Sequence, residues 1–412
     1  MEGNSRGLES ADEVLRRRAE RVVPGGMWGH MNVARLPAGY PQYFRSARGC
    51  RLTDVDGRSY IDLMCAYGPI ILGYGDEDVE AATAVQRRLG DVMTGPSEIQ
   101  VELAELFVAT VPHADWAMFA KNGTDATTSC VTIARALSGK RKILVARGSY
   151  HGAVPWCSPS LEGVTMEDRA HIAYFDYNDA GSLERAADEA GKDLAAILVT
   201  AFKHDTRKDQ ELPDPIFART ARRICDAAGA ALILDDVRAG FRIDLGGSWE
   251  PLGVRPDLSA WSKAVANGHA LAVVAGVDRY RQAAARVYLT GSFWCGAVAM
   301  AAAVATIRKL STTNAIAKMA AMGQRLRDGL TVQSQMYGFS LRQTGPAQMP
   351  QILFDGDADF ALGNRFVAEA MKRGVYMHPW HNMFLSAAHT ETDIDDVLEA
   401  TDGAFRAMRK TA

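Results

Sequence analysis

Short apolar runs alternate with longer amphipathic segments between about residues 120 and 280. Runs of this kind, without regular polar positions, are typical of strands that are buried on both faces. Helix-length segments separate the runs, which favours a parallel sheet covered by helices on both sides. The pattern therefore predicts an α/β domain whose strands lie at residues 142–146, 171–175, 195–200, 230–235 and 272–276.

The segment 214–228 shows helical periodicity most clearly. A proline at position 215 suits a first helical turn, and the glycine at position 229 is a typical stop. We expect a crossover helix here, because one helical face carries the apolar side chains Ile216, Phe217, Ala221, Ile224 and Cys225.

After residue 296 the pattern changes to mainly helical periodicity, which predicts a smaller α+β unit. Its expected helices are 297–310, 313–337, 360–373 and 392–408, and its expected strands are 340–342 and 351–354. We expect three parts in the chain: an N-terminal segment 1–60 that joins the small domain, a large domain 61–310, and a C-terminal small domain 311–412.

The composition narrows the class of protein. With 412 residues, 48% hydrophobic and 23% charged, the chain has the make-up of a globular enzyme. Its 46 basic and 49 acidic residues leave a net charge of −3, which provides no broad basic surface for nucleic acid. The apolar stretches fall short of the ~18 residues that a membrane-spanning helix needs. We therefore expect neither nucleic acid nor a membrane as a partner.

Targeting, disulfide and metal signals are all absent from the sequence. The first twenty residues carry five acidic side chains and no apolar core segment, so we expect no signal peptide and a cytoplasmic location. Six cysteines occur without a CxxC pair, which indicates reduced thiols rather than disulfides or a zinc site. His378 and His381 stand three apart with a proline between them, which disfavours a metal site. No Walker A loop and no GxSxG elbow is present.

Three features remain that carry chemistry, and each has an ordinary alternative. In the first, Asn122, Gly123 and Thr124 open a predicted helix directly after the apolar run 116–119. Free N–H groups at a helix start, with a glycine for close approach and a threonine hydroxyl, make a phosphate cradle. The alternative is an ordinary helix cap.

The second feature is Asp235, which ends an apolar run two residues before Val237. On an extended strand these two side chains share a face, and Asp236 points the opposite way. A carboxylate beside an aliphatic group at the carboxyl end of a parallel strand can hold a protonated ring nitrogen while the aliphatic group packs on the ring. The alternative is a solvated turn.

The third feature is Lys263, which also ends an apolar run and is one of eleven lysines against 35 arginines. A partly desolvated lysine loses proton affinity and can form a Schiff base, although most lysines are simply exposed. Together the three features offer partners for a phosphate, a ring nitrogen and an aldehyde carbon. They predict pyridoxal 5′-phosphate (PLP) as the cofactor.

Further short motifs are distributed along nearly the whole chain. They are Val23 to Gly26, Asp54 to Gly57, Tyr60 to Asp62, Gly68-Pro69, Tyr150-His151-Gly152, Pro256 to Leu258, Ala387 to Thr390 and Asp393 to Asp395. With these motifs the chain resembles the class III PLP-dependent aminotransferases, in the branch that contains glutamate-1-semialdehyde aminomutase. The resemblance implies a fold-type I α/β structure with a large domain around a mainly parallel sheet and a smaller α+β domain.

The resemblance also implies roles for individual residues. Lys263 corresponds to the Schiff-base lysine and Asp235 to the partner of the pyridine nitrogen. Val237 and Tyr150 would cover the two faces of the ring. The phosphate would be held by Gly123 and Thr124 and, from the neighbouring subunit, by Ser292, which implies a homodimer with shared active sites.

The departures from the family concern the substrate. Where the aminomutase carries an arginine after Pro-Gly-Gly, this chain has Met27 to Val33, and an acidic residue near the C-terminus is replaced by His381. Strings such as MCAYGP, TGPSEI, DDVRAGFR, LTGSFW and NMFLSAAHT resemble instead the bacterial aminotransferases of hydrolysed fumonisin, a long-chain amino-polyol, with pyruvate as amino acceptor. Candidates to line the amine pocket, each of which could equally be core, are Trp28, Tyr67, Trp294 and Trp380, with His381 beside them.

We therefore expect an ω-transaminase-type enzyme that moves the amino group of a hydrophobic or long-chain primary amine to a keto acid such as pyruvate. The alternatives are an aminomutase, which needs no external acceptor, and a PLP-binding protein without turnover. The acceptor's carboxylate needs a cationic partner. The sequence does not choose among Arg238, Arg242 and Arg207 for this role.

Overall fold

The computed structural model describes residues 9–410 and contains one large sheet of seven strands in the order β4-β10-β9-β8-β7-β5-β6. The strands are β4 (Trp116–Ala120), β5 (Lys142–Ala146), β6 (Ile172–Phe175), β7 (Leu194–Thr200), β8 (Ala231–Asp235), β9 (Leu258–Trp261) and β10 (Ala272–Gly276). Each apolar run predicted as a strand therefore forms one, within one residue at each end.

The expectation of a parallel sheet holds for five neighbouring strands and fails for one predicted strand. The strands β9, β8, β7, β5 and β6 pair in parallel, whereas β10 runs antiparallel to both β9 and β4. The ten residues between β9 and β10 are too few for the crossover helix that a parallel connection requires, so the chain has to turn back.

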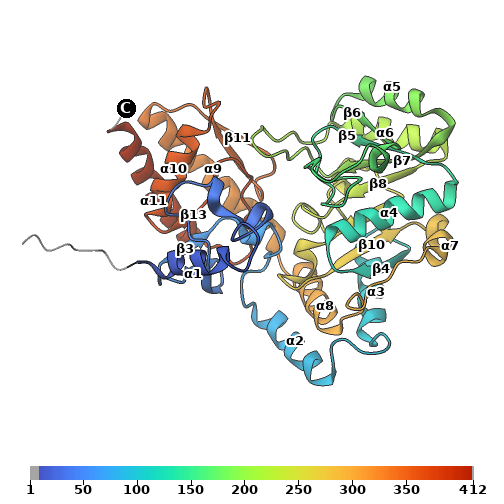
Figure 1. The fold of residues 1–412 in the computed structure, drawn as a ribbon, viewed down its shortest axis with the longest axis horizontal. Helices are drawn as coiled ribbons and strands as arrows, with labels where there is room; N and C mark the ends of the chain where they lie inside the picture. Colours follow the sequence, from blue (N-terminus) through green and yellow to red (C-terminus); the bar gives the residue numbers. More distant parts are fainter. Residues whose placement is uncertain (1–8, 411–412) are drawn as a thin grey trace, which may run out of the picture.

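Helices cover both faces of this sheet, as Figure 1 shows. On one face α4 (Gly123–Ser138) and α7 (Asp278–Arg286) share a core with the strands, and on the other face α5 (Ala180–Ala190) and α6 (Pro215–Ala228) do so. The predicted crossover helix is α6, which Asp214 caps at its start and Gly229 ends with φ +59°. Buried on both faces, the strands have no need of alternating polar residues.

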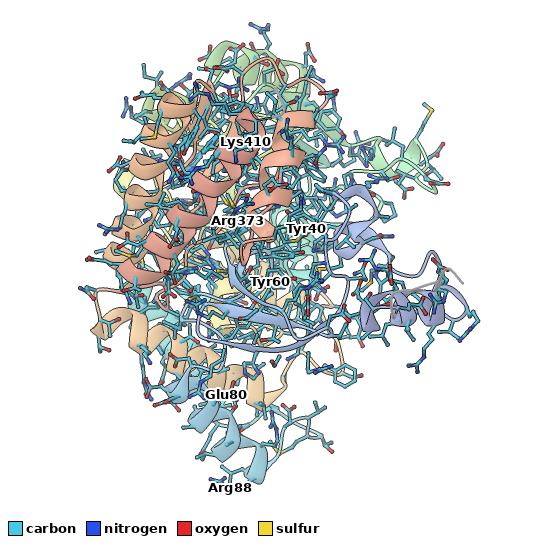
Figure 2. The ribbon with its side chains drawn as sticks, turned by 90° about the vertical axis from the view of Figure 1, so that its left-hand side faces the viewer. Tyr40, Tyr60, Glu80, Arg88, Arg373 and Lys410 are labelled. Atoms are coloured by element: carbon cyan, nitrogen blue, oxygen red, sulfur yellow. The ribbon has the colours of Figure 1, made fainter. Side chains whose placement is uncertain are left out.

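A second region is built from segments near both ends of the sequence (Figure 1). The strands β1 (Phe44–Arg48), β2 (Arg51–Asp54) and β3 (Ser59–Asp62) form a sheet with β13 (Val375–Tyr376), which pairs in parallel with β3. Figure 2 labels Tyr40 and Tyr60, whose rings lie 5.4 and 6.2 Å from that of Tyr376. The other elements here are α1 (Ala11–Glu20), α9 (Ala315–Tyr337), β11 (Leu341–Thr344), β12 (Gln351–Phe354), α10 (Ala361–Met371) and α11 (Glu391–Arg409).

Three helices share one hydrophobic core with β10 of the large sheet and with β13 of the second region. They are α2 (Glu77–Leu89), α3 (Ile99–Thr110) and α8 (Ala297–Thr312). The helix α8 is buried along most of its length, as its small side chains allow. Across residues 9–410, every helix is too short or too polar to cross a membrane. The predicted domain limits at residues 60 and 310 stay a prediction.

Candidate active site

A cavity of about 240 Å³ lies where the carboxyl ends of β8 and β9 meet the start of α4. Crevices at the carboxyl ends of parallel strands are the usual ligand sites of open α/β sheets. The structure brings together here all the predicted cofactor-binding residues except Ser292. The lining residues are Asn122, Gly123, Thr124, Thr127, Tyr150, His151, Gly152, His204, Asp235, Val237, Arg238 and Lys263.

The start of α4 leaves two backbone donors for an anion. Asn122 accepts a hydrogen bond from the N–H of Asp125, and the Asp125 carboxylate accepts one from the N–H of Asn122. Among hydrogen bonds within residues 9–410, the N–H groups of Gly123 and Thr124 have no acceptor. The segment is thus a helix cap that keeps donors at the positive end of the helix dipole, where a phosphate binds well.

Glycine is needed at two positions around this cradle. A Cβ on Gly123 would lie 2.7 Å from Cγ1 of Val237, and one on Gly152 would lie 2.6 Å from Oγ1 of Thr124. Gly152 also has φ +133°, a conformation that other residues rarely adopt. Val237 can therefore approach the backbone of Gly123, and Thr124 that of Gly152, only because both glycines lack a side chain.

Asp235 is held rigidly at the end of β8. It is 6% exposed, and its Oδ2 lies 2.7 Å from Nδ1 of His151, while its Oδ1 accepts the N–H of Val237. Thr127 in turn donates to the carbonyl of His151. His151 was not among the predicted site residues, although it lies in the Tyr150-His151-Gly152 motif that carried the family resemblance.

Asp236 faces away from the cavity, as predicted, but for a different reason. The strand β8 ends at Asp235, so Val237 lies in the following turn and not on a continued strand. Asp236 is 1% exposed and accepts the N–H of Ser248, and burial raises the pKa of its carboxyl to about 7. The two adjacent carboxylates therefore have separate environments.

Lys263 begins a short 3₁₀ helix (Lys263–Ala266) directly after β9, with φ +46°. Burial holds the pKa of its amine well below the usual value, and the nearby Arg238 lowers it further against the opposing attraction of Asp235. A neutral amine is the form that attacks a carbonyl carbon. The Lys263 side chain lies against Gly68, where an added Cβ would come within 3.2 Å of its Cδ.

The ring of Tyr67 contacts the rings of three histidines near the cavity. Its ring lies 4.8 Å from that of His30, 5.3 Å from that of His381 and 6.3 Å from that of His378. Burial lowers the pKa of all three imidazoles, to about 3 for His378. These rings are therefore uncharged at neutral pH. Trp380 belongs to the same group through its edge contact with His378 at 4.3 Å.

The other predicted site residues lie elsewhere in this chain. Trp28 is 69% exposed, and Trp294 packs against the core beside the large sheet. Ser292 is exposed and is not part of the cavity lining. His204 lines the cavity without having been predicted, because a single histidine between a strand and a loop gives no sequence signal.

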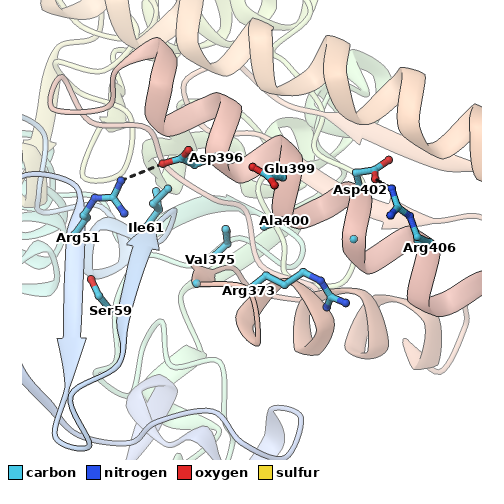
Figure 3. A pocket seen from close by; sticks show the side chains of 12 residues that line it. Arg51, Ser59, Ile61, Arg373, Val375, Asp396, Glu399, Ala400, Asp402 and Arg406 are labelled. Carbon is cyan, nitrogen blue, oxygen red and sulfur yellow. Dashed lines mark hydrogen bonds and ion pairs between the residues drawn. The ribbon is translucent and has the colours of Figure 1, made fainter.

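A larger groove, of about 670 Å³, lies between β3, β13 and α11 (Figure 3). Its arginines already have acidic partners: Arg51 pairs with Asp396, Arg373 with Glu369, and Arg406 with Asp402. None of the predicted site residues lines it. Because its cations are neutralised internally, we assign the chemistry to the smaller cavity.

Comparison with known proteins gives the class of protein. The model of the class III aminotransferase family matches residues 37–401. The chain therefore belongs to the class III aminotransferases, and the resemblance inferred from its motifs is confirmed. Enzymes of this family use PLP, so the predicted cofactor and the predicted fold-type I architecture are confirmed as well.

Individual relatives are similar over nearly their full lengths. The chain is 53% identical over 394 residues to an aminopentol aminotransferase from Sphingopyxis macrogoltabida, covering 96% of this chain and 93% of that protein. The PLP internal aldimine form of the FumI protein from Sphingopyxis sp. MTA144 matches with a TM-score of 0.96 and 53% identity, over 97% of this chain and 96% of that chain. A glutamate-1-semialdehyde 2,1-aminomutase from Nitrosomonas europaea is 28% identical, over 97% of this chain and 98% of that protein.

Proposed function

We propose that this aminotransferase moves the amino group of a hydrophobic or long-chain primary amine to a small keto acid such as pyruvate. The observation that carries the proposal is the single cavity in which Lys263, Asp235 and the free N–H groups of α4 meet. The chemistry of these groups fits the aldehyde, the ring nitrogen and the phosphate of PLP, and all of them line one cavity.

Each residue then has a distinct task. Lys263 would hold the cofactor through its amine and would move the proton of the amine-bearing carbon as general acid and base. Asp235, whose carboxylate lies 2.7 Å from Nδ1 of His151, would keep a positive charge on the ring nitrogen. When bound, PLP supplies an electron sink for that carbon. Val237 and Tyr150 would cover the two faces of its ring, and Gly123 and Thr124 would bind its phosphate.

The long-chain amine is supported by the surroundings of Tyr67. Burial lowers the pKa of the three histidines there, so these uncharged rings offer no cation to a carboxylate on the donor. The aminopentol aminotransferase at 53% identity has a name that points to an amino-polyol donor, and this similarity supports a related donor here. His381, Tyr67 and Trp380 are the proposed pocket residues, with Trp28 and Trp294 as further candidates.

The test compares two reactions of one enzyme preparation. We expect kcat/KM for a long aliphatic amine with pyruvate to exceed that for isomerisation of glutamate 1-semialdehyde. The aminomutase reading predicts the reverse, and it also predicts turnover without any external keto acid. A protein that binds PLP and fails to aminate it in a single turnover with a series of amines would contradict both enzyme readings.

We further propose a homodimer in which Ser292 of each subunit completes the phosphate site of the other. The exposure of Ser292 outside its own cavity supports this arrangement. Dilution to monomer should release the cofactor, as measured by sedimentation and absorbance. A fully active monomer would contradict the shared site.

We also propose that the protein functions in a reducing compartment such as the cytoplasm, because its six cysteines are all free thiols.

A further inference from the structure

Arg238 is a buried guanidinium that has no carboxylate bound to it. Its exposed fraction is 9%, and no ion pair within residues 9–410 includes it. One terminal nitrogen, Nη1, donates to Oδ1 of Asn382 and lies 3.3 Å from Nε2 of His381. Burial lowers the pKa of Arg238 to about 10, so the group stays charged at neutral pH. Asp235 stabilises this charge through space, but both hydrogen-bond partners of the guanidinium are neutral. A buried charge without a directly bound anion is costly.

The remaining donors of Arg238 are accessible and have no partner among the described residues. Within the described residues its Nε and Nη2 make no hydrogen bond, and neither is sealed away among the buried unpaired atoms. Arg238 lines the cavity together with Lys263 and Asp235. An arginine fork with two free N–H groups matches the two oxygens of a carboxylate.

The other two candidate arginines are engaged elsewhere. Arg242 is fully buried and donates to the carbonyls of Gly68, Ile70 and Leu385, so it holds the backbone and is not available to a ligand. Arg207 is exposed, and its guanidinium lies 4.6 Å from the ring centre of Trp380 and 5.8 Å from that of Phe360. It borders a different hollow beside Phe354 and Pro379.

We propose that Arg238 binds the carboxylate of the keto-acid acceptor and thereby determines the enzyme's choice of acceptor. The inference rests on the proposed transamination. In a 2-keto acid the carbonyl carbon is one bond from the carboxylate, so a carboxylate bound to Arg238 keeps that carbon in the cavity that Lys263 also lines. A primary amine without a carboxylate makes no use of this contact. Asn382 and His381 keep the guanidinium in place while such an amine occupies the site.

Binding is the first test, because it does not depend on turnover. Propionate and its neutral analogue propionamide are titrated by calorimetry into the PLP-loaded protein and into Arg238→Gln. We expect propionate to bind about 10- to 100-fold more weakly to the variant, because the variant lacks the charge-assisted hydrogen bonds to the carboxylate. Propionamide should bind both proteins equally. The control Arg207→Gln removes the same positive charge at another place and should bind propionate like the unchanged protein. If this control loses as much affinity for propionate as Arg238→Gln, the assignment is wrong.

The two half-reactions give the second test. Arg238 also lowers the pKa of Lys263, so the variant is judged by the difference between its two half-reactions. In single turnovers of Arg238→Gln, the second-order rate constant with pyruvate should fall about 10- to 100-fold more than the rate constant with a long aliphatic amine. An equal fall in both half-reactions would mean that Arg238 only positions the loop of His381, and the inference would be wrong. Failure of the unchanged enzyme with every amine would reject the proposed function, and propionate binding would still decide the role of Arg238.

Discussion

The cavity at the ends of β8 and β9 and the groove beside α11 are both lined by charged residues, but their charges are arranged differently. In the groove, arginines and acidic side chains pair with one another at the surface. In the cavity, Lys263 and Arg238 are desolvated and lack ion pairs within residues 9–410, and two backbone donors are free. The groove is the larger space. Unpaired, desolvated charge therefore marks the functional site better than size does.

The largest expected effect is that of Lys263→Ala. The change removes both the primary amine that holds the cofactor and the group that moves the proton, so we expect turnover to fall by more than about 10³-fold. Borohydride reduction of the unchanged holoenzyme, followed by peptide mapping, should label Lys263. A label on another lysine would show that the cofactor is held outside this cavity, and the cavity would no longer be the active site.

Asp235→Asn should have the next largest effect. A neutral amide cannot stabilise a positive charge on the ring nitrogen, so we expect proton abstraction to slow by at least about 10²-fold while the cofactor stays bound. Stopped-flow absorbance measures the step. Asp236→Asn is the matched control, since the neighbouring carboxylate faces away and accepts from Ser248. Equal kinetic effects of the two changes would contradict the separate environments assigned to them.

Asp236→Asn should alter stability rather than chemistry. The pKa of Asp236 is raised from 3.8 to about 7 by burial, so the folded state favours the protonated acid. The unchanged protein then loses stability from this group as the pH rises from about 4 to about 7, where the folded carboxyl ionises. Asparagine does not ionise, so the melting temperature of the variant should gain on that of the unchanged protein across this interval. A constant difference would show that the carboxyl is not desolvated in solution.

The sequence predicted the large sheet well because strands buried on two faces leave an unmistakable apolar pattern. It missed the antiparallel direction of β10, which depends on the length of one connection. It also missed β1 to β3, because β1 is largely exposed and β3 is buried through its pairing with β13 from the far end of the sequence. Asp235 and Lys263 were predictable because each ends an apolar strand. The orienting contact of His151 and the separate fates of the three arginines depend on which side chains meet in space, and no local pattern encodes that.

The smallest expected effect is that of Arg51→Ala in the groove. Arg51 is about half exposed and pairs with Asp393 and Asp396 of α11. Exposed pairs contribute about 0.2–1 kcal/mol, and salt screens them, so we expect a small loss in the free energy of unfolding that shrinks at high ionic strength. Turnover should stay within about twofold, because surface changes remote from a site rarely alter it. Denaturant titration at two salt concentrations and steady-state kinetics measure both quantities. A tenfold loss of turnover would mean that paired surface charge also serves the reaction, and the contrast between groove and cavity would no longer identify the active site.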